Sequence, residues 1–270
     1  MSLPTVELPA ESTPADNDFT PAEVEQFQRD GYAIVRGLCD ESLRSRMLAA
    51  TRDGLARFVP PIEYEADLQY PGAPVAADAA GGRTVRRLKQ AHSRDMAFTE
   101  WAMHAGLVQR LRQLLGPDLV MPLAHHNCVM TKHPKFSSET GWHQDVRYWS
   151  FERPELISVW LALGNERPEN GCLQLIPGTH CMEFDRSQLD ESQFLRADLP
   201  ENAPLLDGRI YAELEPGDVL FFHCRTFHAA DQNNSETPKF SAVLTYRPAD
   251  NPPLPNSRSS SLPELVIPAG

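Results

Sequence analysis

The apolar positions in the first part of the chain follow the spacing of α-helices. Val24 and Phe27 lie about one turn apart, and they follow a Thr-Pro-Ala-Glu sequence at 20–23 that is typical of a helix start with a capping box. Apolar residues with helical spacing predict two further helices, at about 40–58 and 97–115, and the second of these ends at a Gly-Pro pair. Between the first two helices, an apolar run at 32–35 predicts a short strand.

From about residue 119 onward, short β-type runs alternate with turn signals. Alternation along 157–163 places Trp160 on one face of a strand together with Ser158 and Ala162, while Ile157 and Val159 lie on the other. Several short strands with this spacing indicate a sandwich or barrel, so the sequence predicts helices followed by an all-β core. The predicted strands of this core are 124–131, 156–163, 172–176, 218–223 and 240–247.

The remaining segments are rich in turn-forming residues. Residues 59–83 contain several Pro and Gly and predict a long loop that could cover a site. The N-terminal segment 1–18 has few large apolar side chains, so we expect a flexible tail, and we expect an irregular C-terminal tail at 251–270. The chain of 270 residues then contains a single domain at 19–250.

Composition excludes several classes of function. The net charge of -12 disfavours nucleic acid as a partner, because an acidic protein repels a phosphate backbone. The sequence has neither an apolar stretch of about 20 residues nor a basic and apolar leader, so we expect no membrane association and no secretion. Five cysteines without a CxxC pair predict free thiols in a reducing compartment, and therefore a cytoplasmic protein.

Candidate metal ligands lie in the second half of the chain. His143 and Asp145 are two residues apart, so from the end of one strand they could bind the same metal ion. Two imidazoles and one carboxylate are the usual ligands of catalytic Fe(II), which requires a further histidine. The apolar run at 219–222 is followed by His223 and His228, and the spacing alone does not choose between them.

Several segments, taken together and in order, resemble the phytanoyl-CoA dioxygenase family of Fe(II)/2-oxoglutarate oxygenases. They are FQRDGYAIV at 27–35, WHQD at 142–145, VWLAL with ENGCL and IPGTH between 159 and 180, and the segment 217–235. The resemblance implies a mainly β fold with flanking helices, built on a double-stranded β-helix or jelly roll. It also implies that His143, Asp145 and His228 bind Fe(II), which leaves His223 as a structural residue.

The resemblance also implies residues that bind the co-substrate 2-oxoglutarate. Trp160 matches a tryptophan that lines the co-substrate pocket, Lys89 resembles a nearby lysine, and Cys128 stands where relatives often have methionine. Relatives usually have an arginine eleven residues after the last ligand, whereas this chain has Lys239, which keeps the charge and loses the planar fork. A hydroxyl such as Ser241 could assist it.

The activity implied by the family is hydroxylation of a small molecule, with 2-oxoglutarate and O2 converted to succinate and CO2. Halogenating relatives lack the ligand carboxylate, so the presence of Asp145 favours hydroxylation. Tyr148, Trp149 and the loop at 59–83 are candidates for the rim of the substrate site. Two alternatives remain open at this point, namely a cupin-like metalloenzyme that does not use 2-oxoglutarate and a non-catalytic protein that binds a metal or ligand. The sequence does not identify the substrate.

Overall fold

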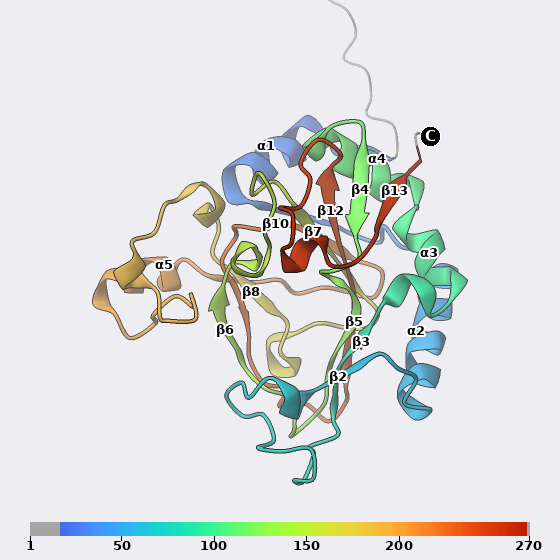
Figure 1. Cartoon of the computed structure of the whole chain (residues 1–270), viewed down its shortest axis with the longest axis vertical. Helices are drawn as coiled ribbons and strands as arrows, with labels where there is room; N and C mark the ends of the chain where they lie inside the picture. Colours follow the sequence, from blue (N-terminus) through green and yellow to red (C-terminus); the bar gives the residue numbers. More distant parts are fainter. Residues whose placement is uncertain (1–16, 269–270) are drawn as a thin grey trace, which may run out of the picture.

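The computed structural model describes residues 17–268, and its centre consists of antiparallel strands, with most of the helices along the top and right side of the view (Figure 1). The α-helices in this part of the chain are α1 (Pro21–Asp30), α2 (Glu41–Ala56), α3 (Met96–Ala102), α4 (Ala105–Leu115) and α5 (Ala203–Asp207). The strands are β1 (Tyr32–Val35), β2 (Ile62–Tyr64), β3 (Val85–Lys89), β4 (Leu119–Pro122), β5 (Asn127–Lys132), β6 (Thr140–His143), β7 (Ile157–Ala162), β8 (Leu173–Leu175), β9 (Ile210–Tyr211), β10 (Val219–His223), β11 (His228–Ala230), β12 (Lys239–Pro248) and β13 (Glu264–Ile267). Short 3-10 helices connect them at η1 (Glu65–Asp67), η2 (Ala91–Ser93), η3 (Asp145–Tyr148), η4 (Pro168–Asn170), η5 (Thr179–Cys181), η6 (Arg186–Gln188), η7 (Pro200–Asn202) and η8 (Arg258–Ser260).

The described strands form two antiparallel sheets. The larger sheet has the order β1-β10-β7-β12-β5-β3-β2, and β4 joins it by pairing with the end of β12. The smaller sheet has the order β6-β11-β8-β9. Neighbours within each sheet are mostly distant in sequence, and the two sheets pack face to face, so the architecture is the predicted jelly roll.

Each face of the larger sheet packs against a different layer. Ile157, Val159 and Leu161 of β7 pack with buried apolar residues of α2, α3 and α4, and Figure 1 shows α2 and α3 along this side. Trp160 and Ala162 of the same strand pack with β8 and β11 of the smaller sheet. The predicted alternation along this strand is therefore confirmed, and it directs Trp160 into the space between the sheets.

The helical predictions are confirmed at the N-terminus and wrong at one position further on. The Thr20 hydroxyl accepts from the Glu23 backbone and the Glu23 carboxylate accepts from the Thr20 backbone, so the predicted capping box is present. The single helix predicted at 97–115 is divided, because the chain leaves the helical path at Met103 and His104. This break lets α3 and α4 direct separate apolar faces, including Trp101 and the leucines of α4, into one core.

Other segments contain more regular structure than the sequence predicted. The expected loop at 59–83 includes β2, which pairs with β3. The expected irregular segment at 251–270 includes η8 and β13, and β13 pairs with β4 while Glu264 forms an ion pair with Arg247. Of the predicted N-terminal tail, residues 1–16 lie outside the described residues. Within the described part of the chain, no helix combines the length and apolar character needed to cross a membrane.

Two glycines with positive φ provide a test of how α1 is joined to the sheets. Gly31 (φ 78°) ends α1, and an added Cβ would lie 2.5 Å from His180 Nδ1 and 2.6 Å from Thr226 Oγ1, whereas nothing lies within 4 Å of a Cβ at Gly37 (φ 60°). Gly37→Ala should lower the free energy of unfolding by about 1 kcal/mol through the backbone alone. Gly31→Ala should cost roughly 1–3 kcal/mol more, because it also overpacks. Urea unfolding of both variants measures the difference, and equal losses would contradict this close packing.

Candidate metal centre

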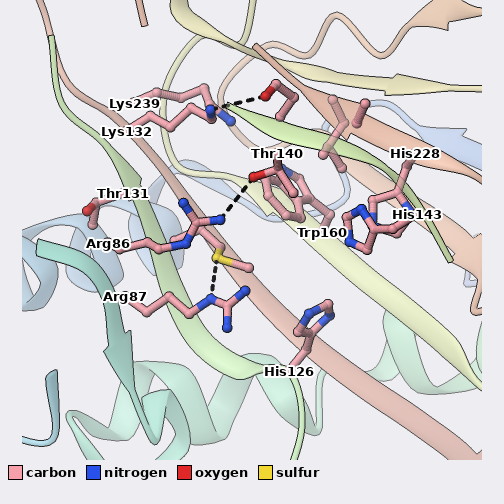
Figure 2. A pocket seen from close by; sticks show the side chains of 14 residues that line it. Arg86, Arg87, His126, Thr131, Lys132, Thr140, His143, Trp160, His228 and Lys239 are labelled. Atoms are coloured by element: carbon pink, nitrogen blue, oxygen red, sulfur yellow. Dashed lines mark hydrogen bonds between the residues drawn. The ribbon is translucent and has the colours of Figure 1, made fainter. Parts of the chain in front are cut away.

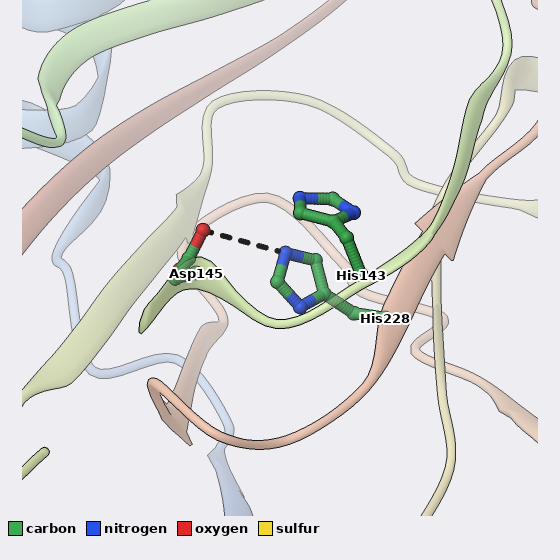
Figure 3. A group of neighbouring side chains, drawn as sticks. All are labelled: His143, Asp145 and His228. Carbon is green, nitrogen blue, oxygen red and sulfur yellow. Dashed lines mark ion pairs between the residues drawn. The ribbon is translucent and has the colours of Figure 1, made fainter. Parts of the chain in front are cut away.

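Three predicted ligands meet where the smaller sheet joins the first turn of η3 (Figure 3). His143 ends β6, Asp145 begins η3 and His228 begins β11, and β6 and β11 pair with His143 directly opposite His228. One ligand atom from each side chain lies within 4.8 Å of the other two. The two imidazole centroids are 4.2 Å apart, and His228 Nε2 is 3.7 Å from Asp145 Oδ1. All three side chains are buried.

Asp145 lies on a different element from the one predicted. We expected His143 and Asp145 to share a face of one strand, but β6 ends at His143 and the chain turns into η3. The turn is held by the loop after β10, since Gln144 Nε2 donates to the Arg225 carbonyl at 2.5 Å and the Val146 amide donates to the Cys224 carbonyl at 3.1 Å. The same loop leads directly into His228, so these bonds bring the three ligands together.

Hydrogen bonds orient both imidazoles for metal binding. His143 Nδ1 lies 2.8 Å from the Gly141 carbonyl, and His228 Nδ1 lies 3.0 Å from the Thr226 carbonyl. A carbonyl only accepts, so each Nδ1 carries the proton and each Nε2 has a free lone pair. Burial and the neighbouring His228 hold the pKa of His143 well below its usual value, which keeps this imidazole neutral. The donor set therefore fits Fe(II).

The carboxylate of Asp145 is held in its charged form. Burial alone would raise its pKa, but nearby imidazoles, with His126 the strongest, and a hydrogen bond from Ser158 together lower it. Ser158 Oγ donates to Oδ2 at 2.9 Å, and His126 Nδ1 is 3.6 Å from the same oxygen. His126 was not predicted from the sequence, because nothing in its spacing links it to the ligands. It lies just before β5, and the pairing of strands that are distant in sequence brings it here.

Two cavities adjoin the three ligands, and Arg87, His126, Thr140 and His143 line both. The lysine cavity has a volume of about 60 Å³ and extends from the two histidines past Trp160 to a group of cations (Figure 2). Its further lining includes Arg86, Lys132, Trp160, His228 and Lys239. The aromatic cavity has a volume of about 420 Å³, and its further lining includes Tyr70, Lys89, Cys128, Asp145, Tyr148, Trp149 and Arg258.

The predicted co-substrate residues are divided between these cavities. Lys239 and Trp160 lie in the lysine cavity, and the Lys239 ammonium is 5.0 Å from the centre of the Trp160 ring. Lys89 and Cys128 are paired across β3 and β5 and line the aromatic cavity instead. Burial raises the pKa of Cys128 to about 11, so its thiol is neutral. The structure therefore brings together two of the four residues, and the roles of all four stay predictions.

Glu166 is a site residue that the sequence analysis missed. Its side chain is fully buried behind the lysine cavity, and it accepts from Trp160 Nε1 at 2.8 Å, Ser241 Oγ at 2.6 Å and Lys239 Nζ at 3.0 Å. Ser241, which was expected to assist in co-substrate binding, donates to this carboxylate. No spacing rule connects Glu166 to Lys239, because their contact depends on the pairing of β7 with β12.

The predicted rim residues surround the aromatic cavity. Tyr148 and Trp149 line it, as does Tyr70 from the loop at 59–83, and the hydroxyls of Tyr70 and Tyr148 are 3.0 Å apart. Arg147 stacks on Phe194, with its guanidinium carbon 3.9 Å from the ring centre. A role for these residues in substrate binding stays a prediction.

The two candidate histidines can be distinguished by metal binding. His223 faces His180, with ring centroids 5.4 Å apart, and is outside the metal-binding group, whereas His228 belongs to it. His228→Ala, like His143→Ala and Asp145→Ala, should weaken Fe(II) binding by more than about 100-fold, since even loss of an outer partner costs about 10- to 100-fold. His223→Ala should leave it within about threefold. Anaerobic equilibrium dialysis measures both, and a large loss with His223→Ala would contradict the assignment.

Known proteins similar to this chain include several oxygenases. It is 26% identical over 254 residues to an ectoine dioxygenase of Halomonas elongata, covering 88% of this chain and 72% of that protein. It is 24% identical over 221 residues to a probable phytanoyl-CoA dioxygenase of Caenorhabditis elegans, covering 78% and 69%.

Solved structures with the same fold include EctD from S. alaskensis with 2-oxoglutarate and 5-hydroxyectoine, with a TM-score of 0.73, 21% identity and coverage of 94% of this chain and 85% of that one. The epimerase SnoN in complex with Fe3+, alpha ketoglutarate and nogalamycin RO gives a TM-score of 0.69 and 22% identity, covering 87% and 85%. The sequence pattern of the family described as phytanoyl-CoA dioxygenase (PhyH) matches residues 27–241, and this chain belongs to that family.

Proposed function

We propose that this protein is an Fe(II)- and 2-oxoglutarate-dependent dioxygenase that hydroxylates a small molecule and releases succinate and CO2. The observation that carries the proposal is the position of His143, Asp145 and His228 beside two cavities, one lined by lysines and one lined by aromatic side chains. Two imidazoles and one carboxylate leave coordination positions free on Fe(II). Membership of the family and relatives named ectoine dioxygenase support the same class of reaction.

The lysine cavity suits the co-substrate. Iron bound by the three ligands would supply the coordination positions at which an oxo acid and O2 react. A dicarboxylic oxo acid also needs cations at the end away from the metal, and Lys132 and Lys239 lie at that end of the cavity, with Trp160 as a wall (Figure 2). Burial here strengthens the attraction between an ammonium and a carboxylate, because water is excluded.

The aromatic cavity suits the molecule that is oxidised. It adjoins Asp145 and His143 from another side, and it is larger than the lysine cavity. Burial lowers the pKa of His125 to about 3 and that of His126 to about 4, so both imidazoles are neutral at neutral pH. They therefore offer polar, uncharged surfaces to a substrate. Arg258 and Lys89 supply positive charge to the same cavity.

A cupin-like enzyme without 2-oxoglutarate is less well supported. Such sites usually include a further His or Glu ligand, whereas between residues 17 and 268 the metal-binding group consists of His143, Asp145 and His228. His126 approaches Asp145 and lies outside this group. A non-catalytic binding protein on the same fold differs from an oxygenase in turnover, so the test must measure more than metal binding.

Anaerobic titration of the Fe(II)-loaded protein with 2-oxoglutarate tests the proposal. A weak visible metal-to-ligand charge-transfer band should appear, because the oxo acid chelates the iron, and admission of O2 should then yield succinate. Asp145→Ala should abolish the band. Lys239→Ala should raise the concentration needed for half-maximal absorbance about 10- to 100-fold, as expected for loss of a hydrogen bond between charged groups.

Ser235→Ala is a suitable control and should leave the band unchanged. Among the described residues, the Ser235 hydroxyl bonds within its own turn, to Asn233 and Thr237. Iron binding without a band would favour the binding protein or another oxidant. A band without succinate in the presence of O2 would contradict a dioxygenase that turns over 2-oxoglutarate on its own, and would require turnover to be tested with candidate substrates.

A further inference from the structure

Two lysines face one another at the end of the lysine cavity away from the metal ligands. Lys132 of β5 and Lys239 of β12 are direct partners in the register of the larger sheet, and Figure 2 shows their side chains running side by side. Lys239 is buried, and Lys132 is partly buried. Like charges directly opposite each other destabilise a sheet. The repulsion between the two ammonium groups must therefore be offset by other contacts, and these differ between the two lysines.

Lys239 has a counter-charge and spare hydrogen-bond donors. Its ammonium is 3.0 Å from a Glu166 carboxylate oxygen, and both side chains are buried. Glu166 is fixed in turn by Trp160 and Ser241. The pair is neutral as a whole, yet it uses one of the three N–H groups of the ammonium. Among the described residues, Glu166 is the hydrogen-bond partner of this ammonium, so two N–H groups remain for a ligand in the cavity.

The ammonium of Lys132, in contrast, has hydrogen-bond acceptors that carry no net charge. Its ammonium donates to the backbone carbonyls of Ser138 at 2.8 Å, Ala230 at 3.4 Å and Asp231. These three acceptors satisfy its N–H groups without cancelling its charge. Two acidic side chains act on this ammonium without contacting it, and both have other partners: Glu65 pairs with Arg86 at 3.1 Å, and Asp231 accepts from Gln174 at 2.8 Å. Among the residues that the structure describes, no carboxylate is in direct contact with Lys132, so no ion pair neutralises the charge of its protonated form.

The other cations of the cavity are already paired. Arg86 lies 3.1 Å from Glu65, and Arg87 lies 3.3 Å from Glu63. With Lys239 paired to Glu166, three of the four cations lining the cavity are each in contact with a carboxylate, and Lys132 is the fourth. One positive charge remains, which matches one carboxylate of a ligand.

We propose that Lys132 and Lys239 together hold the distal carboxylate of the oxo acid, Lys132 by its charge and Lys239 by its hydrogen bonds, with Glu166 as the counter-ion that limits the strength of this site. The assignment rests on the proposed function. In this assignment, two lysines determine specificity for the distal carboxylate where one cation was predicted. The carboxylate of Glu166 weakens their attraction for the ligand.

A series of charge variants tests the assignment by titration of the charge-transfer band. Lys132→Met removes the surplus charge and should weaken 2-oxoglutarate binding at least about tenfold. Glu166→Gln adds one positive charge and should strengthen it about tenfold. The double variant restores the original charge and should return within about threefold of the unmodified protein. Pyruvate has the same oxo acid group and no distal carboxylate, so its binding should stay constant throughout.

The outcomes separate this inference from the proposed function. If the unmodified protein gives no band with 2-oxoglutarate, the proposed function fails. If it gives a band and Lys132→Met binds 2-oxoglutarate normally, Lys132 only joins strands and the inference is overturned, as it is if pyruvate binding changes in parallel. Lys132→Met leaves three carbonyls without their donor, so Glu166→Gln, which keeps those bonds, carries the test if the first variant does not fold.

The pH profile supplies a second readout. Burial, followed by the charges of Lys239 and Arg86, lowers the pKa of Lys132 to about 7, although Glu65 and Asp231 act in the opposite direction. Above pH 7 the free protein increasingly loses this charge, so 2-oxoglutarate affinity should fall as pH rises from 7 to 9. Lys132→Arg keeps its charge in this range and should remove the decline, with pyruvate again unaffected. A decline that persists in Lys132→Arg would overturn the inference.

Discussion

The pairing of β6 with β11 is the constraint on which the rest of the site depends. It sets His143 directly opposite His228, although the two residues are far apart in sequence, and the loop that leads into β11 also holds the turn that carries Asp145. The candidate metal centre is therefore built from the sheet register and from two hydrogen bonds to backbone carbonyls. Small shifts of register would separate the ligands, because a slip by one residue directs a side chain to the opposite face.

Burial of charge is the second constraint, and it links the cavity to the fold. Moving an unpaired ion out of water costs several kcal/mol, so the buried cations require partners. Arg86 pairs with the fully buried Glu65 and also donates to Thr140 at the start of β6, while Lys239 pairs with Glu166. The ion pair at Arg86 consequently helps to fix the strand that carries the candidate ligand His143. The contacts that neutralise the buried cations therefore also position the candidate site.

How much could be predicted from the sequence depended on how local each feature is. The capping box of Thr20 and Glu23 and the direction of Trp160 follow from spacing within one element, and both were predicted correctly. The choice of His228 came from family resemblance, since spacing left His223 equally eligible. Glu166 was missed because its place in the site depends on its contact with Lys239 of β12, which is remote in sequence. The break between α3 and α4 was missed for a similar reason, because tertiary packing overrode a continuous helical pattern.

The carboxylate of Glu166 gives a physical reason why lysine, and not arginine, suits position 239. A guanidinium is planar and offers parallel N–H groups that match both oxygens of a carboxylate, so beside Glu166 it would tend to form a two-pronged internal pair. Its remaining donors would be fixed in direction. An ammonium makes one bond to Glu166 and keeps two rotatable donors for the cavity. Because Glu166 neutralises the charge of Lys239, the positive charge that attracts the ligand comes from Lys132. The donors of Lys132 are themselves occupied by carbonyls. The lysine at position 239 is thus understood only together with Glu166 and Lys132, because the charge and the hydrogen bonds offered to the ligand come from different side chains.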